Sequence, residues 1–359
     1  MKKWVRKNLV ALSENTGLGL WKKSLVFLEN IYLFLIFYWR IAKTQLMLRR
    51  IGLRKDSLAI SLQTRNNLDF GRFPLRVINP SLCVKGKTIY GVARITNGYI
   101  ERYCDYAGRP IQQFRTRGER LIEGIIEFQT DTFGHISNLR VLQTPTNIPN
   151  YQDPRIFSFK SEIYIVMTQM LEEKYLNAGR WRSGVSIQKV ETGELINLKS
   201  PLSKGIEKNW IPILNEESIK LLYSSNPISI IELDNFSSNY KFHKTDYSST
   251  LHLNNRSQMV KVKDDNFSYI RVASRKFANL KYGYTPLHYF ELLSEEFKPL
   301  ALSRPFVFSS RQMEICNSLV LDGETLILAW TENEETNMIG TLPIQSIFSM
   351  FSLDFDRRL

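Results

Sequence analysis

Five polar residues that could bind or process a polar substrate each stand near the start of an apolar stretch. They are Asn79, Asp153, Asn209, Gln258 and Glu314, at intervals of 74, 56, 49 and 56 residues. Amide side chains can hold polar substrate atoms through hydrogen bonds, and a carboxyl group can also transfer a proton. If the five stretches converge, these side chains would surround one pocket.

The segments that must position them are short, and from about residue 60 they alternate apolar with polar residues. Stretches such as PLRVINPSLCVKGKTIYGVARI and SLVLDGETLILAWTEN predict strand, turn and strand. A recurrence of about 50 residues has room for a four-stranded sheet and is typical of propeller blades. The sequence therefore predicts an all-β, five-bladed β-propeller over residues 61–350. The long first interval would hold an extra hairpin.

The motifs at these positions resemble those of a known family. NPSL from Asn79, followed by Arg94, and QDPRIF around Asp153 are similar to the first two inner strands of glycoside hydrolase family 130. EKNWIP, YTPLHYF and QMEICNSLVLDG are similar to later blades of this family and of related propellers from bacterial glycan-synthesis clusters. The resemblance covers roughly residues 70–345 and implies a β-mannoside phosphorylase-like propeller.

The resemblance also implies an inverting reaction on mannoside-type linkages, either glycosyl transfer or phosphorolysis. Asp153 would supply a proton to the glycosidic oxygen through a hydroxyl of the bound sugar, with Glu314 as the second catalytic carboxyl. The expected substrate-binding residues are Asn79, Arg94, Arg155, Lys208, Asn209, Trp210, Gln258 and His288. We expect no cofactor and no metal, with a glycan and inorganic phosphate or a sugar phosphate as substrates.

Each of these residues also has a structural explanation. An aspartate before Pro154 and Arg155 can cap backbone N–H groups. Trp210 is either a stacking platform for a sugar or a wedge between blades, and His288 suits a buried strand equally well. The family pattern changes at three positions, where Gln152 replaces a glutamate, Arg256 is displaced and Glu334 replaces an aspartate. A non-catalytic glycan-binding propeller is therefore the alternative.

The net charge of +13 is concentrated in the first 60 residues. This segment holds twelve Lys or Arg residues against three acids, a balance of +9 that leaves +4 for the remaining 299 residues. A nucleic-acid groove along the chain is therefore not expected. The basic residues surround the uncharged run 30–39, which is shorter than the roughly 20 residues that span a bilayer.

Residues 1–60 thus predict a basic helical segment that precedes the propeller and a tail at 351–359. Trp21 and Trp39 near the ends of the apolar run suit a helix that lies on an anionic membrane surface through residues 1–55. A helix packed on the main domain and a short tilted anchor are the alternatives. Three widely spaced cysteines favour a reducing compartment. The expected location is the cytoplasm, with peripheral attachment at the inner membrane face.

Overall fold

Alternating apolar side chains and left-handed turn residues form the hairpins of the protein. The computed structural model describes residues 59–71, 75–104, 110–117, 122–142, 151–170, 183–202, 209–214, 217–234, 236–248, 253–262, 264, 267–279, 283–309 and 313–351, together with Ile31, Leu35, Trp39 and Ala42. Strands β2 (Arg76–Lys85) and β3 (Thr88–Thr96) join through a turn at Gly86, where φ is 62°. Strands β20 (Glu314–Asp322) and β21 (Thr325–Glu332) join in the same way at Gly323, where φ is 58°. A glycine adopts this backbone conformation without steric cost.

The chain divides into two compact units, of which the larger comprises residues 55–99, 114–276 and 286–359. The smaller unit comprises residues 1–54, 100–113 and 277–285. The larger unit carries nearly all the described strands, so the sheets below are described within it.

Five groups of four hydrogen-bonded strands follow one another along the described chain. The first is β2, β3, β6 (Glu123–Thr130) and β7 (Ile136–Val141); the second is β8 (Tyr151–Phe159), β9 (Glu162–Met170), β10 (Ser183–Lys189) and β11 (Leu195–Leu198). The third is β12 (Ile211–Leu214), β13 (Ile219–Ser225), β14 (Ile228–Leu233) and β15 (Tyr240–Lys244); the fourth is β16 (Asn254–Lys261), β17 (Tyr269–Asn279), β18 (Gly283–Leu293) and β19 (Pro299–Leu302). The fifth combines β20, β21 and β22 (Thr336–Pro343) with β1 (Thr64–Asn67).

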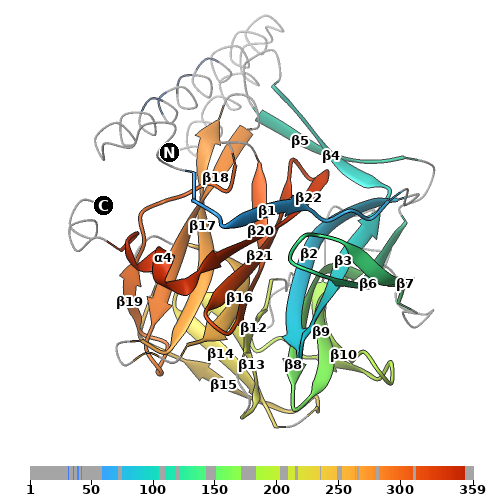
Figure 1. Ribbon diagram of the computed structural model, residues 1–359, viewed down its shortest axis with the longest axis vertical. Helices are drawn as coiled ribbons and strands as arrows, with labels where there is room; N and C mark the ends of the chain where they lie inside the picture. Colours follow the sequence, from blue (N-terminus) through green and yellow to red (C-terminus); the bar gives the residue numbers. More distant parts are fainter. Residues whose placement is uncertain are drawn as a thin grey trace, which may run out of the picture. The chain divides into compact units, whose positions relative to one another are not determined.

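The first strand of each of the first four groups, together with β20 of the fifth, lies on the inside of a closed ring. Strand β2 contacts β8, β8 contacts β12, β12 contacts β16, β16 contacts β20, and β20 returns to β2. Strands β12 and β16 also pair in parallel, which joins the third and fourth groups into one eight-stranded sheet. Radial sheets around a ring of inner strands make a β-propeller, so the predicted all-β propeller fold is confirmed (Figure 1).

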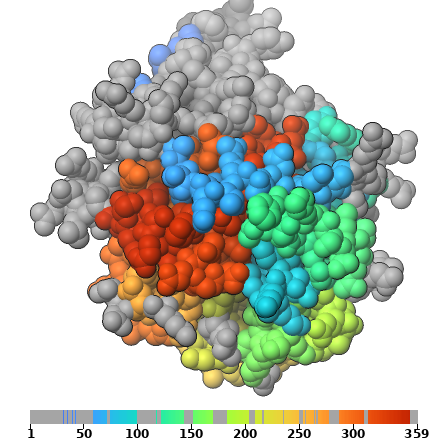
Figure 2. Space-filling view, viewed as in Figure 1, coloured from blue at the N-terminus to red at the C-terminus, as the bar shows by residue number. Residues whose placement is uncertain are grey.

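The N-terminal strand completes the fifth sheet at the edge opposite β20, which the sequence motifs did not predict. Strand β1 pairs antiparallel with β22, with Thr64 opposite Thr341 and Asn67 opposite Met338. The hydroxyl groups of Thr64 and Thr341 lie 2.8 Å apart. Figure 2 shows the blue N-terminal strand lying against the red C-terminal segment, so the first and last described strands share one sheet.

A hairpin and a helix lie outside these five groups of strands. Strands β4 (Gly98–Cys104) and β5 (Pro110–Thr116) follow β3 and precede β6 in the chain, and they pair with each other in a two-stranded sheet. They form the extra hairpin expected in the long first interval. Helix α4 (Ile344–Phe348) follows β22 and buries Ile344 and Ile347; the sequence analysis did not predict it.

Most of the predicted N-terminal segment and of the C-terminal tail lies outside the described residues. Four residues of the N-terminal segment are described, and Ile31, Leu35, Trp39 and Ala42 are all helical and exposed. None of the helices in the described part of the chain is long and apolar enough to cross a membrane.

Candidate functional site

A residue with left-handed backbone conformation lies near the start of three of the inner strands. Asn79, Asp153 and Asn209 have φ values of 57°, 49° and 60°. Asparagine and aspartate tolerate this conformation better than other residues with a Cβ atom. In β2 and β8 this residue lies within a shift of the pairing register, between Ile78 and Ser81 and between Gln152 and Arg155. Such bulges turn side chains out of the regular strand alternation.

The following prolines explain why an Asp-Pro sequence can begin a strand that is largely buried. Pro80 and Pro154 lie within the two register shifts, where a residue without an N–H loses no ladder hydrogen bond. The backbone N–H of Ile156 is bonded instead to the Ser81 hydroxyl of the neighbouring inner strand, at 3.2 Å. The bulge therefore directs Asp153 away from the core while most of β8 remains buried.

Asp153 is the centre of a polar cluster contributed by neighbouring inner strands. The side-chain amide of Asn79 donates to Asp153 Oδ1 at 2.7 Å, and an Arg94 guanidinium nitrogen lies 4.0 Å from the same oxygen. The amide of Asn317 in turn donates to Asn79 Oδ1 at 3.1 Å. The Asp153 side chain is 25% exposed, so a substrate can reach it. The structure thus brings together Asn79, Arg94 and Asp153, and it adds Asn317, which the sequence analysis missed.

Glu123 is a second member of the cluster that the sequence analysis missed. It lies on β6, where Glu123 faces Thr96 and Ile125 faces Arg94, so Glu123 and Arg94 are diagonal neighbours. The Glu123 side chain has no exposed surface, forms an ion pair with Arg94 and accepts a hydrogen bond from the Gln152 amide at 3.1 Å. The only sequence signal is an acid at the start of an apolar strand, as at Glu314.

Arg155 points into the ring of inner strands. The residue is 4% exposed, and its guanidinium donates to the backbone carbonyl of Asn317. Burial lowers the pKa of Arg155 to about 10, although the negative charge of Asp153 acts in the opposite direction. This side chain links β8 to β20 beneath the polar cluster.

Gln258 also lies inside the ring and has no exposed surface. Its amide nitrogen donates to the Ser81 hydroxyl at 2.8 Å, the Leu82 carbonyl at 2.9 Å and the Ile156 carbonyl at 3.1 Å. Its amide oxygen accepts from the Leu319 N–H at 3.2 Å. The side chain therefore ties β16 to β2, β8 and β20, and these contacts favour a structural role over substrate binding.

The Glu314 carboxylate is held by the segment that precedes β20. It accepts hydrogen bonds from the backbone N–H groups of Phe308 at 2.7 Å and Ser309 at 2.9 Å, and from the Ser309 hydroxyl at 2.8 Å. The residue has no exposed surface. These bonds compensate the cost of burying a carboxylate and favour an anchoring role for Glu314.

His288 and Trp210 are buried in aromatic surroundings. The His288 ring lies 4.9 Å from the Phe308 ring, and burial lowers the pKa of His288 to about 3, helped by the positive charge of Arg256. Trp210 is 2% exposed and packs edge-on against Tyr223 at 5.3 Å, within a core cluster of residues from the second and third sheets. The wedge explanation fits this position of Trp210.

Two predicted binding residues, Lys208 and Asn209, shortly precede β12 in the chain. Asn209 is partly exposed just before β12, and Lys208 lies outside the described residues. Arg256 donates to the Ser274 hydroxyl at 2.6 Å. Within the part of the chain that the structure describes, no group of three or more His, Cys, Asp or Glu side chains is placed to hold a metal ion.

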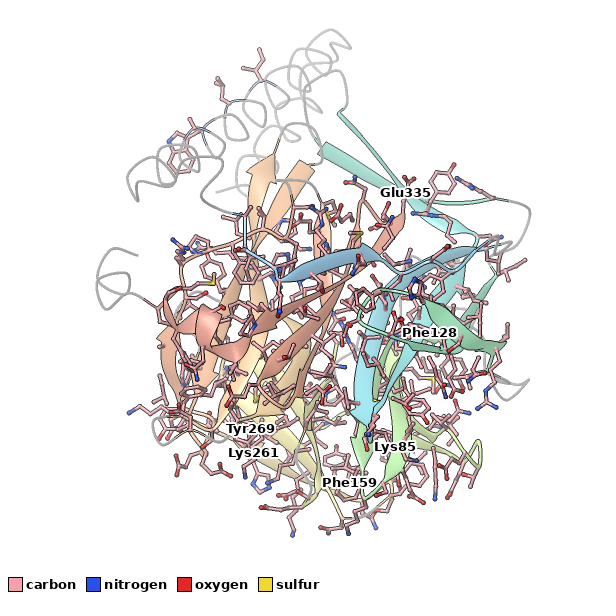
Figure 3. The ribbon with its side chains drawn as sticks, in the orientation of Figure 1. Lys85, Phe128, Phe159, Lys261, Tyr269 and Glu335 are labelled. Atoms are coloured by element: carbon pink, nitrogen blue, oxygen red, sulfur yellow. The ribbon has the colours of Figure 1, made fainter. Side chains whose placement is uncertain are left out.

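A cavity of about 930 Å³ is formed by the opposite, C-terminal ends of the inner strands. Its lining includes Lys85, Phe159, Leu214, Lys261 and Leu321. Figure 3 shows Lys85 and Phe159 toward one end of the larger unit and Glu335, which follows β21, toward the other. The cavity contains none of the predicted site residues, so the candidate site is the polar cluster around Asp153.

No protein-family model matches the chain, and no curated protein matches it in sequence. Among solved structures it is similar to a β-1,2-mannobiose phosphorylase from Listeria innocua in complex with β-1,2-mannobiose, with 11% identity and a TM-score of 0.48 over 82% of this chain and 95% of that one. It is also similar to a mannose phosphorylase from Leishmania mexicana in complex with phosphate ion, with 10% identity and a TM-score of 0.46 over 79% and 89%.

A third similar structure comes from the GH130 family of mannoside phosphorylases, which contains glycoside hydrolases that target β-1,2 mannosidic linkages in Candida mannan. It is 11% identical, with a TM-score of 0.47 over 76% of this chain and 85% of that one. This is the family that the inner-strand motifs resemble. At such identities the likeness concerns the fold.

Proposed function

We propose that the protein is a carbohydrate-active enzyme that makes or cleaves mannoside-type linkages with inversion, in the synthesis of cell-surface polysaccharide. The observation that carries the proposal is the position of Asp153. Its carboxylate is partly exposed on a bulge at the start of an inner strand, and Asn79 and Arg94 hold it there. A polar cluster of this kind around one accessible carboxylate suits proton transfer to a polyhydroxylated substrate.

In the cleavage direction of the proposed reaction the bond between the anomeric carbon and the glycosidic oxygen breaks; in synthesis from a phosphate donor that bond forms and the phosphate group leaves. The leaving oxygen receives a proton that originates from the Asp153 carboxyl and passes through a hydroxyl of the bound sugar, as the family resemblance implies. The acceptor oxygen bonds to the opposite face of the anomeric carbon, which inverts the configuration. If the acceptor is a hydroxyl, the proton that it loses returns to Asp153 through solvent, so no further reactant is consumed.

The test is a screen of the purified protein with mannose 1-phosphate and with GDP-mannose across β-mannoside acceptors. We expect product from one donor with the natural chain and none with Asp153→Asn. Asp131→Asn is the matched control, because Asp131 is an exposed aspartate that bonds to His135 in the turn after β6. A folded natural protein that gives no transfer, hydrolysis or phosphorolysis with any donor would contradict the proposal.

The burial of Gln258, Glu314 and Trp210 supports one alternative, a glycan-binding propeller without catalysis. In that case the cluster around Asp153 would recognise a sugar through hydrogen bonds alone. Calorimetry separates the two functions: equal glycan affinity for the natural protein and Asp153→Asn, with no turnover by either, would favour the binding protein.

We further propose that the N-terminal segment attaches the protein to an anionic membrane surface at the cytoplasmic face. Ile31, Leu35 and Trp39 are spaced by four residues and are 40%, 60% and 62% exposed, so they form an apolar stripe on a helix. The excess of basic residues in this segment complements anionic lipids. Leu35→Asp should abolish sedimentation with phosphatidylserine vesicles, and unchanged sedimentation of this variant would refute the attachment.

A further inference from the structure

The ion pair between Glu123 and Arg94 places a buried negative charge beside the proposed catalytic carboxylate. Glu123 has a fully buried side chain, whereas the side chain of Arg94 is 11% exposed. Besides Arg94, Glu123 accepts hydrogen bonds from Gln152 at 3.1 Å and from the Thr96 hydroxyl at 3.5 Å. Three donors therefore hold this carboxylate in place, and an amide at position 152 complements it where a glutamate would repel it.

The charges of the described residues around the site partly compensate one another. Arg94 experiences the charges of Asp153, Glu334 and Arg76, and Arg155 experiences those of Asp153 and Arg256. Together with the paired Glu123, this makes three carboxylates, Asp153, Glu123 and Glu334, and four guanidinium groups, Arg94, Arg76, Arg155 and Arg256. Arg155 is further engaged by the Asn317 carbonyl inside the ring. Phosphate binding needs accessible positive charge, and at Arg94, the guanidinium beside Asp153, that charge is paired with Glu123.

We propose that Glu123 compensates the charge of Arg94 beside Asp153, so that the site selects a hydroxyl acceptor, from a sugar or from water, over inorganic phosphate. The proposal rests on the function proposed above for the same site. The reaction is then the hydroxyl form of the step already described: the acceptor O–H is replaced by a bond from its oxygen to the anomeric carbon, and its proton reaches Asp153 through solvent. Glu123 is a positioning residue in this account, because it acts through Arg94.

Calorimetric titration with inorganic phosphate tests this assignment without requiring turnover. Glu123→Gln keeps the size of the side chain and removes its charge, so we expect phosphate to bind at least about tenfold more tightly than to the natural protein. Glu127→Gln is the matched control, because Glu127 lies on the same strand, is similarly buried and pairs with Arg140. We expect this control to leave phosphate affinity within about twofold of the natural value, and the double variant Glu123→Gln/Arg94→Gln to lose the gain.

A second variant keeps the proposal testable if Glu123→Gln does not fold. Arg94→Gln should leave the phosphate affinity of the natural protein unchanged, because the charge of Arg94 is already compensated. A tenfold weaker affinity in Arg94→Gln would identify Arg94 as a phosphate ligand and overturn the proposal. An unchanged affinity in folded Glu123→Gln, or an equal gain in Glu127→Gln, would overturn it as well. Absence of turnover with every donor would instead refute the proposed function and leave these binding results interpretable.

Discussion

Replacing Gln258 by leucine should destabilise the propeller without altering glycan recognition. The amide bonds to groups on three other inner strands, and leucine has a similar size but no polar atoms. The Ile156 carbonyl and the Leu319 N–H would lose their bonds to the Gln258 amide, whereas the Leu82 carbonyl keeps a contact with the Ser318 hydroxyl at 3.4 Å. Each buried group left unpaired costs about 1–3 kcal/mol, so two such groups predict a loss of about 2–6 kcal/mol.

Equilibrium unfolding in urea, followed by tryptophan fluorescence, measures this loss as a lower midpoint. Gln129→Leu is the control, because Gln129 is partly exposed and accepts a single hydrogen bond from Asn138 at 2.8 Å. A loss of less than 1 kcal/mol for Gln258→Leu would refute the structural account. Loss of glycan binding at unchanged stability would make Gln258 a substrate-binding residue, as the sequence analysis expected.

Three other perturbations test the buried polar groups. Glu314→Gln should cost about 1–3 kcal/mol in urea unfolding and speed amide exchange at residues 308–309; loss of turnover at unchanged stability would show a catalytic role instead. The pKa of His288, lowered to about 3, lies below its ordinary 6.5, so the stability that depends on this group should be fully present above pH 6.5 and fall by about 1.4 kcal/mol per pH unit between pH 6.5 and about 3. His288→Phe should remove this contribution, and an unchanged pH slope would contradict it. Arg271→Ala leaves the buried Glu291 without its charged partner and should cost about 3–5 kcal/mol, whereas Arg271→Met combined with Glu291→Leu should recover most of the loss.

The fold could be predicted because its hairpins depend on local patterns in the sequence. Each predicted hairpin combines alternating apolar residues with a turn residue that suits a left-handed conformation, as at Gly86, Gly134 and Gly323. The polar residues that recur at the inner strands include Asn79 and Asp153, whose short side chains suit the left-handed positions of the bulges. Sequence spacing therefore located the part of the site that depends on local backbone geometry.

The rest of the site depends on contacts between residues that are distant in the sequence. Glu123 reaches Arg94 only through the register of β3 with β6, and β1 meets β22 across 277 residues at Thr64 and Thr341. Polar residues at the inner strands also differ in direction: Asp153 is partly exposed, whereas Gln258 points into the ring. A sequence motif predicts where a residue lies along its strand, but not toward which side of the strand a bulge directs its side chain.

The central claim is that Asp153 transfers the proton in the reaction. The most direct measurement is kcat for the natural protein and for Asp153→Asn on the best donor and acceptor pair, with glycan affinity measured on both proteins. The account predicts that kcat falls by about 10²–10⁴-fold, as expected for loss of a general acid, while affinity changes little. Equal kcat values for the two folded proteins would contradict it.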